Sequence, residues 1–348
     1  MDPFEGDISS EGLPPMTSPV PVSSKGMAPM ANTPTAPDSE QAEKFLRLCT
    51  SGNAHLEAQD LTCAIVCFAR ALEVGSATPL QELHIRWSLA NLQLSTHNLD
   101  EAQLQLDRFV VLAADLARPA DVLAGYNSLA TVLLDKARRA EALVDEENLG
   151  SNSPHEKTLR DALVVLHKLL TTATASATPS CLFFTQRAFT RLAHVHQDLG
   201  EVDEAIKYAE RSVEALRTPV TSPMDAQGHQ RQAEAIGLLA DLLTTKGYET
   251  QQEFQSILTH RWAQAASAQE ADSPLAVGRA YYELGALYEG AGSYALYYGP
   301  AKARQYYNHA LTELRQLPLS TLGTRGAELV QALTEKLEAL DSDSCVVM

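Results

Sequence analysis

The carboxyl terminus carries the clearest chemical motif of the chain. It reads Cys345-Val346-Val347-Met348, a cysteine followed by two aliphatic residues and a methionine, which is the pattern of a farnesylated C-a-a-X box. Residues 341–344 are Asp and Ser, and we expect them to form a flexible tether that a prenyltransferase can reach. The sequence therefore predicts a farnesyl group on Cys345, and with it a eukaryotic source, with a chance match as the alternative.

Membrane contact through a farnesyl group would be transient. One lipid chain holds a protein weakly, and stable anchoring needs a second lipid or a basic patch. The charged residues before the motif are mostly acidic, so an anionic membrane repels them; they are Glu335, Glu338, Asp341 and Asp343 against Lys336. The amino terminus has no secretion signal, and no apolar run approaches the roughly 18 residues that span a membrane. The predicted location is the cytoplasm, with a peripheral membrane fraction.

Other reactive side chains are better explained by packing or by helix ends. Cys63 and Cys67 lie one helical turn apart, where a metal or redox pair competes with the favoured interpretation of two buried side chains on one apolar face. His194 and His196 are two positions apart, so they point to different faces of a helix. The acidic residues within 201–204 precede a helix, where its dipole favours negative charge.

Composition and missing motifs exclude several classes of function. Lys and Arg number 27 against 44 Asp and Glu, and the resulting net charge of -17 repels nucleic acid. The five cysteines are odd in number and include no CxxC pair, which argues against a disulfide framework. The chain has no glycine-rich phosphate loop, GxSxG or HExxH motif. We therefore predict no cofactor, no metal and no enzymatic activity.

Helix signals divide the chain into segments. Residues 1–39 are rich in Pro, Ser and Thr without periodicity, and are predicted to be a disordered tail. Beyond them, Ser-Pro and Thr-Pro pairs mark helix starts. These pairs are Thr78-Pro79, Ser153-Pro154, Thr178-Pro179, Ser222-Pro223 and Ser273-Pro274, with Arg118-Pro119 in the same role. The predicted organisation is helical hairpins over 40–318, a capping helix over 319–340 and a flexible tail over 341–348.

Small residues recur at a fixed spacing along the helical segment. A pair of small side chains lets two antiparallel helices approach closely where they cross. Four pairs are twelve positions apart: Gly52 and Ala64, Ala90 and Ala102, Ala130 and Ala142, and Ala193 and Ala205. The shared spacing indicates a repeated helical hairpin.

These hairpins resemble tetratricopeptide repeats, whose helices read aromatic-x2-Leu-Gly-x2-Tyr and Ala-x3-Phe-x2-Ala. The last repeat has Tyr281-x2-Leu284-Gly285-x2-Tyr288 and Ala303-x3-Tyr307-x2-Ala310, and it also resembles a Sel1-like repeat. Further matches are Phe189-x2-Leu192-Ala193 and Ala64-x3-Phe68-x2-Ala71. The resemblance covers about residues 41–318. It implies an all-α fold, a right-handed α-solenoid of about six hairpins.

The repeat period departs from that family's 34 residues. The anchoring small residues are 38, 40, 63, 47 and 45 positions apart: Gly52, Ala90, Ala130, Ala193, Ala240 and Gly285. The longest gap holds a polar insertion near 145–157 and an apolar helix over 159–170. We interpret that helix as the second helix of the third hairpin, in competition with the stretch around Ala142. The fifth repeat is predicted to have a recognisable first helix and a poor second one.

Three tyrosines lie where the family pattern requires nothing. Tyr294, Tyr297 and Tyr298 precede Gly299-Pro300 in a predicted loop. Tyr is common at binding surfaces because it buries a large area at little cost in entropy. Contact with a partner and packing back onto the repeats are equal alternatives for this loop.

The resemblance also implies where a partner would bind. Some family members bind the carboxyl-terminal carboxylate of a partner with Lys, Asn and Arg side chains. In this chain Asn53 and Asn91 match the asparagine positions, but Cys49 occupies the position of the first basic residue. A carboxylate clamp of that kind is therefore not expected. The long period is similar to that of kinesin light chains and spindle-orientation G-protein regulators, which bind extended peptides. We predict an adaptor that binds a peptide or helix of a protein partner on its first helices. The alternative is a regulatory subunit of an obligate assembly.

Overall fold

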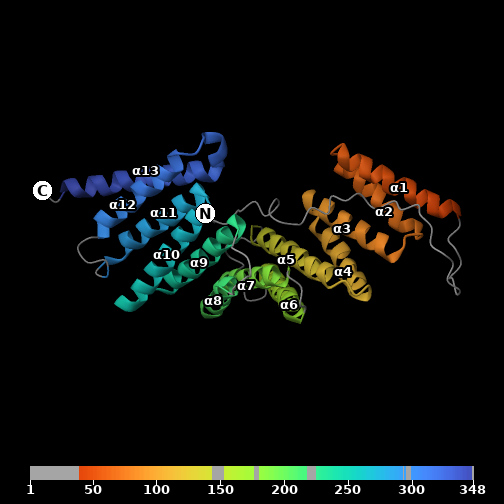
Figure 1. The fold of residues 1–348 in the computed structure, drawn as a ribbon, viewed down its shortest axis with the longest axis horizontal. Coiled ribbons are helices and arrows are strands. Elements are labelled where there is room, and N and C mark those ends of the chain that lie inside the picture. The colour runs from red at the N-terminus through yellow and green to blue at the C-terminus, as the bar shows by residue number, and fades with distance from the viewer. Residues whose placement is uncertain are drawn as a thin grey trace. The chain divides into compact units, whose positions relative to one another are not determined.

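A computed structural model describes residues 39–142, 153–175, 180–217, 225–292, 294 and 299–346. Over these residues the chain forms 13 α-helices and no strand, which confirms the all-α fold class (Figure 1). The helices belong to two compact units, residues 1–184 and 185–348. The tail predicted over 1–39 lies outside the described residues except for Ser39, where the first helix begins.

In the first unit each of the first six helices packs against its neighbours along the chain. The helices are α1 (Ser39–Glu57), α2 (Leu61–Val74), α3 (Pro79–Ser95), α4 (Leu99–Asp115), α5 (Pro119–Ala142), α6 (Pro154–Ala175) and the first residues of α7 (Ser180–Asp198). Gly52 marks the crossing of α1 and α2, because a Cβ there would lie 2.8 Å from the ring of Phe68. Ala64 is fully buried at the same crossing, as the spacing predicts.

The second unit continues in the same manner. It holds the rest of α7, α8 (Val202–Arg217), α9 (Ala226–Lys246), α10 (Gln251–Glu270), α11 (Pro274–Gly290), α12 (Gly299–Arg315) and α13 (Leu319–Val346). Gly285 on α11 faces the ring of Tyr307 on α12, where no Cβ fits. Tyr307 is fully buried, and its hydroxyl donates a 2.6 Å hydrogen bond to Glu289. The last predicted repeat is therefore a close-packed hairpin.

Each predicted helix-start proline that falls on described residues is the first residue of a helix. The helices α3, α5, α6 and α11 begin at Pro79, Pro119, Pro154 and Pro274. Thr78 and Gln81 form a capping box at the start of α3. The pairs at 178–179 and 222–223 lie outside the described residues, and α9 is instead capped by Asp225, which the sequence analysis did not identify.

Three predicted boundaries need correction. Residues 131–142 contain no helix breaker, so α5 runs unbroken to Ala142, and that exposed residue is not the hairpin partner of Ala130. The second helix of the third hairpin is α6, which packs on α5 and confirms the interpretation of the helix over 159–170. The second helix of the fifth repeat is complete, because Thr250 and Glu253 cap α10 with a capping box. The last helix runs from Leu319 to Val346 with non-helical dihedral angles at Gly323, so the predicted tail over 341–348 begins as helix.

No helix in the described part of the chain is both long and apolar enough to cross a bilayer.

Candidate functional site

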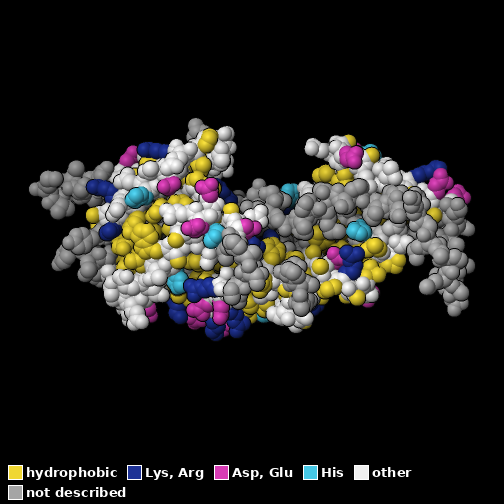
Figure 2. Space-filling model, viewed as in Figure 1, with side chains coloured by type: hydrophobic (Ala, Val, Ile, Leu, Met, Phe, Trp, Pro, Cys, Tyr) yellow, Lys and Arg dark blue, Asp and Glu magenta, His cyan; other side chains and the backbone are white. Residues whose placement is uncertain are grey.

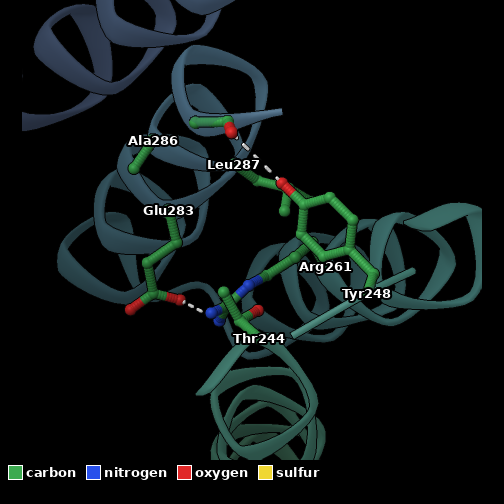
Figure 3. Close-up of a pocket in the computed structure, with 7 residues that line it drawn as sticks. Thr244, Tyr248, Arg261, Glu283, Ala286 and Leu287 are labelled. Carbon is green, nitrogen blue, oxygen red and sulfur yellow. Dashed lines mark hydrogen bonds and ion pairs between the residues drawn. The ribbon is translucent and has the colours of Figure 1, made fainter. Parts of the chain in front are cut away.

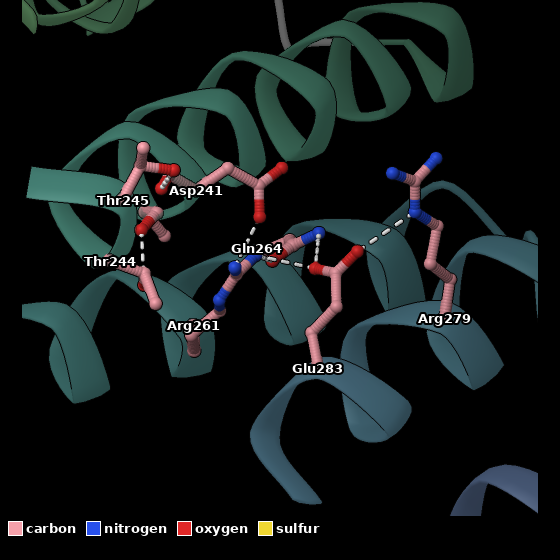
Figure 4. Close-up of polar contacts among 8 residues, drawn as sticks. Asp241, Thr244, Thr245, Arg261, Gln264, Arg279 and Glu283 are labelled. Atoms are coloured by element: carbon pink, nitrogen blue, oxygen red, sulfur yellow. Dashed lines mark hydrogen bonds and ion pairs between the residues drawn. The ribbon is translucent and has the colours of Figure 1, made fainter. Parts of the chain in front are cut away.

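A buried arginine joins three helices of the second unit. Arg261 is only 4% exposed and lies in the middle of α10, within the apolar stripe of that helix. Its guanidinium forms ion pairs with Asp241 on α9 and Glu283 on α11, the latter with Nη1 and Oε2 2.5 Å apart (Figure 4). A single side chain thus links the first helices of two successive hairpins.

Gln264 and Arg279 complete this polar network. The amide of Gln264, one turn after Arg261, accepts a 3.1 Å hydrogen bond from Arg261 and donates a 3.0 Å bond to Glu283. The other oxygen of Glu283 accepts a 2.8 Å bond from Arg279 (Figure 4). Gly237 on α9 makes room, because a Cβ there would lie 2.7 Å from the amide nitrogen of Gln264.

Two arginines and two carboxylates balance the charge of the network. Burial raises the pKa of Asp241 above its ordinary value, and the nearby Glu283 carboxylate raises it further, against the lowering effect of Arg261. Burial acts to lower the pKa of Arg279, but the Glu283 carboxylate outweighs it and the pKa rises. Removing the buried Arg261 would leave two carboxylates without their shared cation in a poorly solvated place, which is costly.

A pocket of about 170 Å³ opens beside the network (Figure 3). Thr244 from α9 and Ala286, Leu287 and Gly290 from α11 line it, together with Tyr248, Arg261 and Glu283. The Tyr248 hydroxyl donates a 3.3 Å hydrogen bond to the carbonyl of Gly290, which ties the turn after α9 to the end of α11. Apolar walls beside a fixed pair of charges form a place for one inserted side chain with a polar end.

Comparisons with known proteins bear on the fold. No family model and no curated protein matches the chain. Among solved structures, the apo form of RapI gives a TM-score of 0.51 at 12% identity, over 86% of this chain and 99% of RapI. The fold is an all-helical repeat similar to that of RapI. Two further structures are similar at lower scores. TTC0263, a tetratricopeptide protein of Thermus thermophilus, gives a TM-score of 0.36 at 19% identity, over 67% of this chain and 92% of TTC0263. The Rap conjugation gene regulator of plasmid pLS20, in complex with the Phr* peptide, gives a TM-score of 0.42 at 11% identity, over 93% of this chain and 81% of the regulator.

The predicted binding residues are divided between the two units. Asn53 on α1 and Asn91 on α3 are half-buried in the first unit, whereas Tyr294 belongs to the second. Tyr294 packs back onto the repeats: its hydroxyl donates a 2.7 Å hydrogen bond to the carbonyl of Glu249, and its ring lies 5.3 Å from that of Tyr248. Tyr297 and Tyr298 lie outside the described residues, so their contact with a partner stays a prediction.

Cys345 lies within α13, and its side chain is outside the described part of the structure. Farnesylation of its thiol stays a prediction. His196 is buried and stacks on Tyr208 at 5.1 Å, in line with a packing role.

The predicted burial of the Cys63 and Cys67 pair is wrong for Cys63. Cys63 is exposed and Cys67 is half-buried. The cause is the position of Cys63 in the first turn of α2, where its amide donates a 3.1 Å bond to the Asp60 cap. Asp60 and His55 place ligand atoms near the Cys63 thiol. The positive end of the helix dipole disfavours a cation at this position, and we assign no metal to it.

The network around Arg261 is the functional feature that sequence reasoning missed. One signal was present: Arg261 interrupts an apolar stripe at helical spacing formed by Phe254, Ile257, Ala265 and Ala268, all buried. A charge at such a position needs partners from neighbouring helices. Its partners Asp241 and Glu283 are distant in sequence, and nothing in their local surroundings sets them apart from surface acids.

Proposed function

We propose that this chain is a protein-interaction scaffold, and that the pocket between α9 and α11 receives one side chain of an extended or helical segment of a partner. The observation that supports this is the pocket's construction. Two successive first helices form its walls, and a charge-balanced network fixes its floor through the buried Arg261. A site whose side chains are already held in place loses little freedom on binding.

The ligand we expect has an apolar stem and a neutral polar end. Ala286, Leu287 and Gly290 offer apolar contacts along one wall. At the opposite edge the carboxylates and guanidinium groups already neutralise each other, so a charged end would unbalance them. Asn, Gln, Thr and Tyr side chains meet this description.

Peptide selection on the intact protein tests the proposal. Peptides selected from a displayed random library should share one polar residue with an apolar stem, and Ala286→Trp, which fills the pocket, should weaken their binding at least tenfold. Ala301→Trp is the matched control, because Ala301 is exposed on α12 and does not line the pocket. Selected peptides that bind both variants equally would contradict a binding role for the pocket.

A second candidate is a subunit of a larger obligate assembly. Exposed apolar side chains in the first unit favour it: Val111 on α4 is 63% exposed, Leu104 lies two turns earlier on the same helix, and Val164 on α6 is 54% exposed. Light scattering of the native protein after gel filtration separates the two candidates. A scaffold is recovered as a free chain, whereas an obligate subunit is found only in a larger particle.

Farnesylation belongs to the proposed function as a means of transient membrane contact. Farnesylation requires Met348 to be the last residue of the protein as it is synthesised in the cell. Mass spectrometry of the carboxyl-terminal peptide tests both where the chain ends and whether Cys345 is modified. The expected result is a peptide carrying a farnesyl group on Cys345, and Cys345→Ser should abolish any membrane-bound fraction. An unmodified thiol would contradict it.

A further inference from the structure

A stripe of exposed side chains runs along the outer face of α4 in the first unit. Its members recur at intervals of four, three and four residues, which places them on one face of the helix. They are Leu104, Arg108, Val111 and Asp115. Leu104 is 42% and Val111 is 63% exposed, and both charged members are exposed as well. We call these four residues the α4 stripe.

The charged members of the α4 stripe have no partner within the described part of the chain. Neither the Arg108 guanidinium nor the Asp115 carboxylate forms a hydrogen bond or ion pair with another described side chain. The two lie seven residues apart, about 10 Å along the helix axis, so they do not pair with each other. Asp115 is also the last residue of α4, where the helix dipole disfavours a negative charge. A cation from another chain would stabilise this carboxylate.

A hollow of about 390 Å³ lies beside the α4 stripe, between α3 and α4. Arg108, Val111 and Asp115 line it, whereas Leu104 does not. The other lining residues are Glu82, Arg86, Asp107 and Leu112. Over α4, on the face shown in Figure 2, hydrophobic side chains lie beside acidic and basic ones. The surface therefore offers an exposed leucine and, next to it, a recess that is partly apolar.

The α4 stripe is complementary to itself when two copies of the helix run antiparallel. With a two-fold axis midway between Arg108 and Val111, Arg108 of one copy lies beside Asp115 of the other. Parallel helices would instead place like charges opposite each other, which is destabilising. The stripe carries one positive and one negative charge, whereas the chain as a whole carries -17 and repels a second copy elsewhere on its surface. Charge complementarity therefore favours a second copy of this chain as the occupant.

We propose that the α4 stripe is the interface of a homodimer, in which α4 packs antiparallel against α4 of a second copy. Leu104 of each copy packs against Val111 of the other in its hollow, and Arg108 of each copy pairs with Asp115 of the other. One helix from each copy gives a small interface, so the two copies exchange and the dimer depends on concentration. This interface is independent of the pocket between α9 and α11, and it differs from an obligate assembly because it requires no other subunit.

Sedimentation equilibrium of the purified full-length chain tests the proposal. The average mass should rise with concentration from 37.7 kDa towards twice that value. Leu104→Asp places a new negative charge near Asp115 of the other copy and should keep the chain single over the same range. Leu275→Asp is the matched control, because Leu275 on α11 is similarly exposed at 37%, and it should associate like the wild-type chain. Circular dichroism confirms that both variants keep their helices.

Exchanging the two charges tests the antiparallel arrangement. Arg108→Asp and Asp115→Arg should each weaken association by about tenfold or more, because each places like charges together. The double variant carrying both changes restores opposite charges across the interface and should associate like the wild-type chain. The proposal is overturned if the wild-type chain stays single or exceeds two copies, if Leu104→Asp and Leu275→Asp associate equally, or if the double variant does not recover.

Discussion

Two glycines at helix crossings allow close helix packing in two different surroundings, one apolar and one polar. Gly125 on α5 lies in the first unit, where a Cβ would come 2.5 Å from a methyl of Val110 on α4. Gly237 on α9 lies in the second unit, where a Cβ would come 2.7 Å from the amide of Gln264 on α10. Both crossings need a residue without a side chain, but only the second has a polar group behind it.

The difference lies in how each core responds to change. The neighbours of Gly125 are the buried side chains of Val110 and Phe109, which a Cβ would approach to 2.5 and 3.0 Å, so both must move and repack. Gln264 cannot shift without losing its bonds to Arg261 and Glu283. A buried polar network is stable when every member is satisfied and is strained by the loss of any one. The predictions below probe this contrast.

The largest effect is expected from Arg261→Met. The change leaves Asp241 and Glu283 facing each other without their shared cation, and should cost about 3–5 kcal/mol of unfolding free energy. Arg279→Met is the matched control, because Arg279 forms its pair with Glu283 at the half-exposed rim and should cost less than about 1 kcal/mol. Denaturant unfolding measures both; equal losses would remove the distinction between a buried network and a surface pair.

Overpacking a crossing should come next. Leucine at Gly285 meets the buried ring of Tyr307, and leucine at Ala205 wedges α7 from α8, so each should cost about 1–3 kcal/mol or more. Thermal unfolding followed by circular dichroism measures the losses. If both variants melt like the wild-type chain, the assignment of these residues to crossings is wrong.

Adding one methyl group to each of the two compared glycines gives the most direct test. At both positions alanine gains up to about 1 kcal/mol in helix propensity. Gly125→Ala should cost about 1–3 kcal/mol because the buried Val110 and Phe109 must move, and Gly237→Ala should cost more than Gly125→Ala because it also displaces Gln264 from its hydrogen bonds. Equal costs in denaturant unfolding would mean that the polar network adapts as readily as the apolar core.

The smallest effect on stability is expected from Glu289, which links α11 to α12 and α13 through hydrogen bonds with Tyr307 and Lys336. Burial acts to raise the pKa of Glu289, but hydrogen bonds from Tyr307 and Lys336 outweigh it and hold the pKa below its ordinary value. A carboxylate with a lowered pKa stabilises the fold above its unfolded-state pKa of about 4.3, and this contribution is lost as pH falls through the folded value.

Glu289→Gln should therefore lower stability at pH 7 by less than about 1 kcal/mol, the range of exposed ion pairs. The difference from wild type should shrink as pH falls below about 4. Unfolding curves at several pH values measure it, with Glu335→Gln, exposed on α13 but without a bond to α11, as the control. A difference that does not change with pH would contradict the lowered pKa.

Much of the fold could be predicted because its signals are local. Proline after Ser or Thr places helix starts within a few residues, as at Pro79 and Pro154. Failures also have local causes: the exposed Ala142 matched a spacing by chance inside an unbroken helix, and the capping box of α10 was overlooked. The pocket beside Arg261 was not predicted from the sequence. None of Asn53, Asn91 and Tyr294 lines the pocket.

By itself, the sequence determined the all-helical fold, the four helix starts at described prolines and the close crossing of Gly285 with Tyr307, because each follows from backbone stereochemistry or from a small residue at a fixed offset. Tertiary structure alone decided the network of Arg261 and the ring contacts of Trp262 with Tyr281 and Tyr306. Their members come from three helices, and an arginine is tolerated in a core only when neighbouring helices bring carboxylates to it. That meeting depends on how the helices pack, which no residue spacing within one helix specifies.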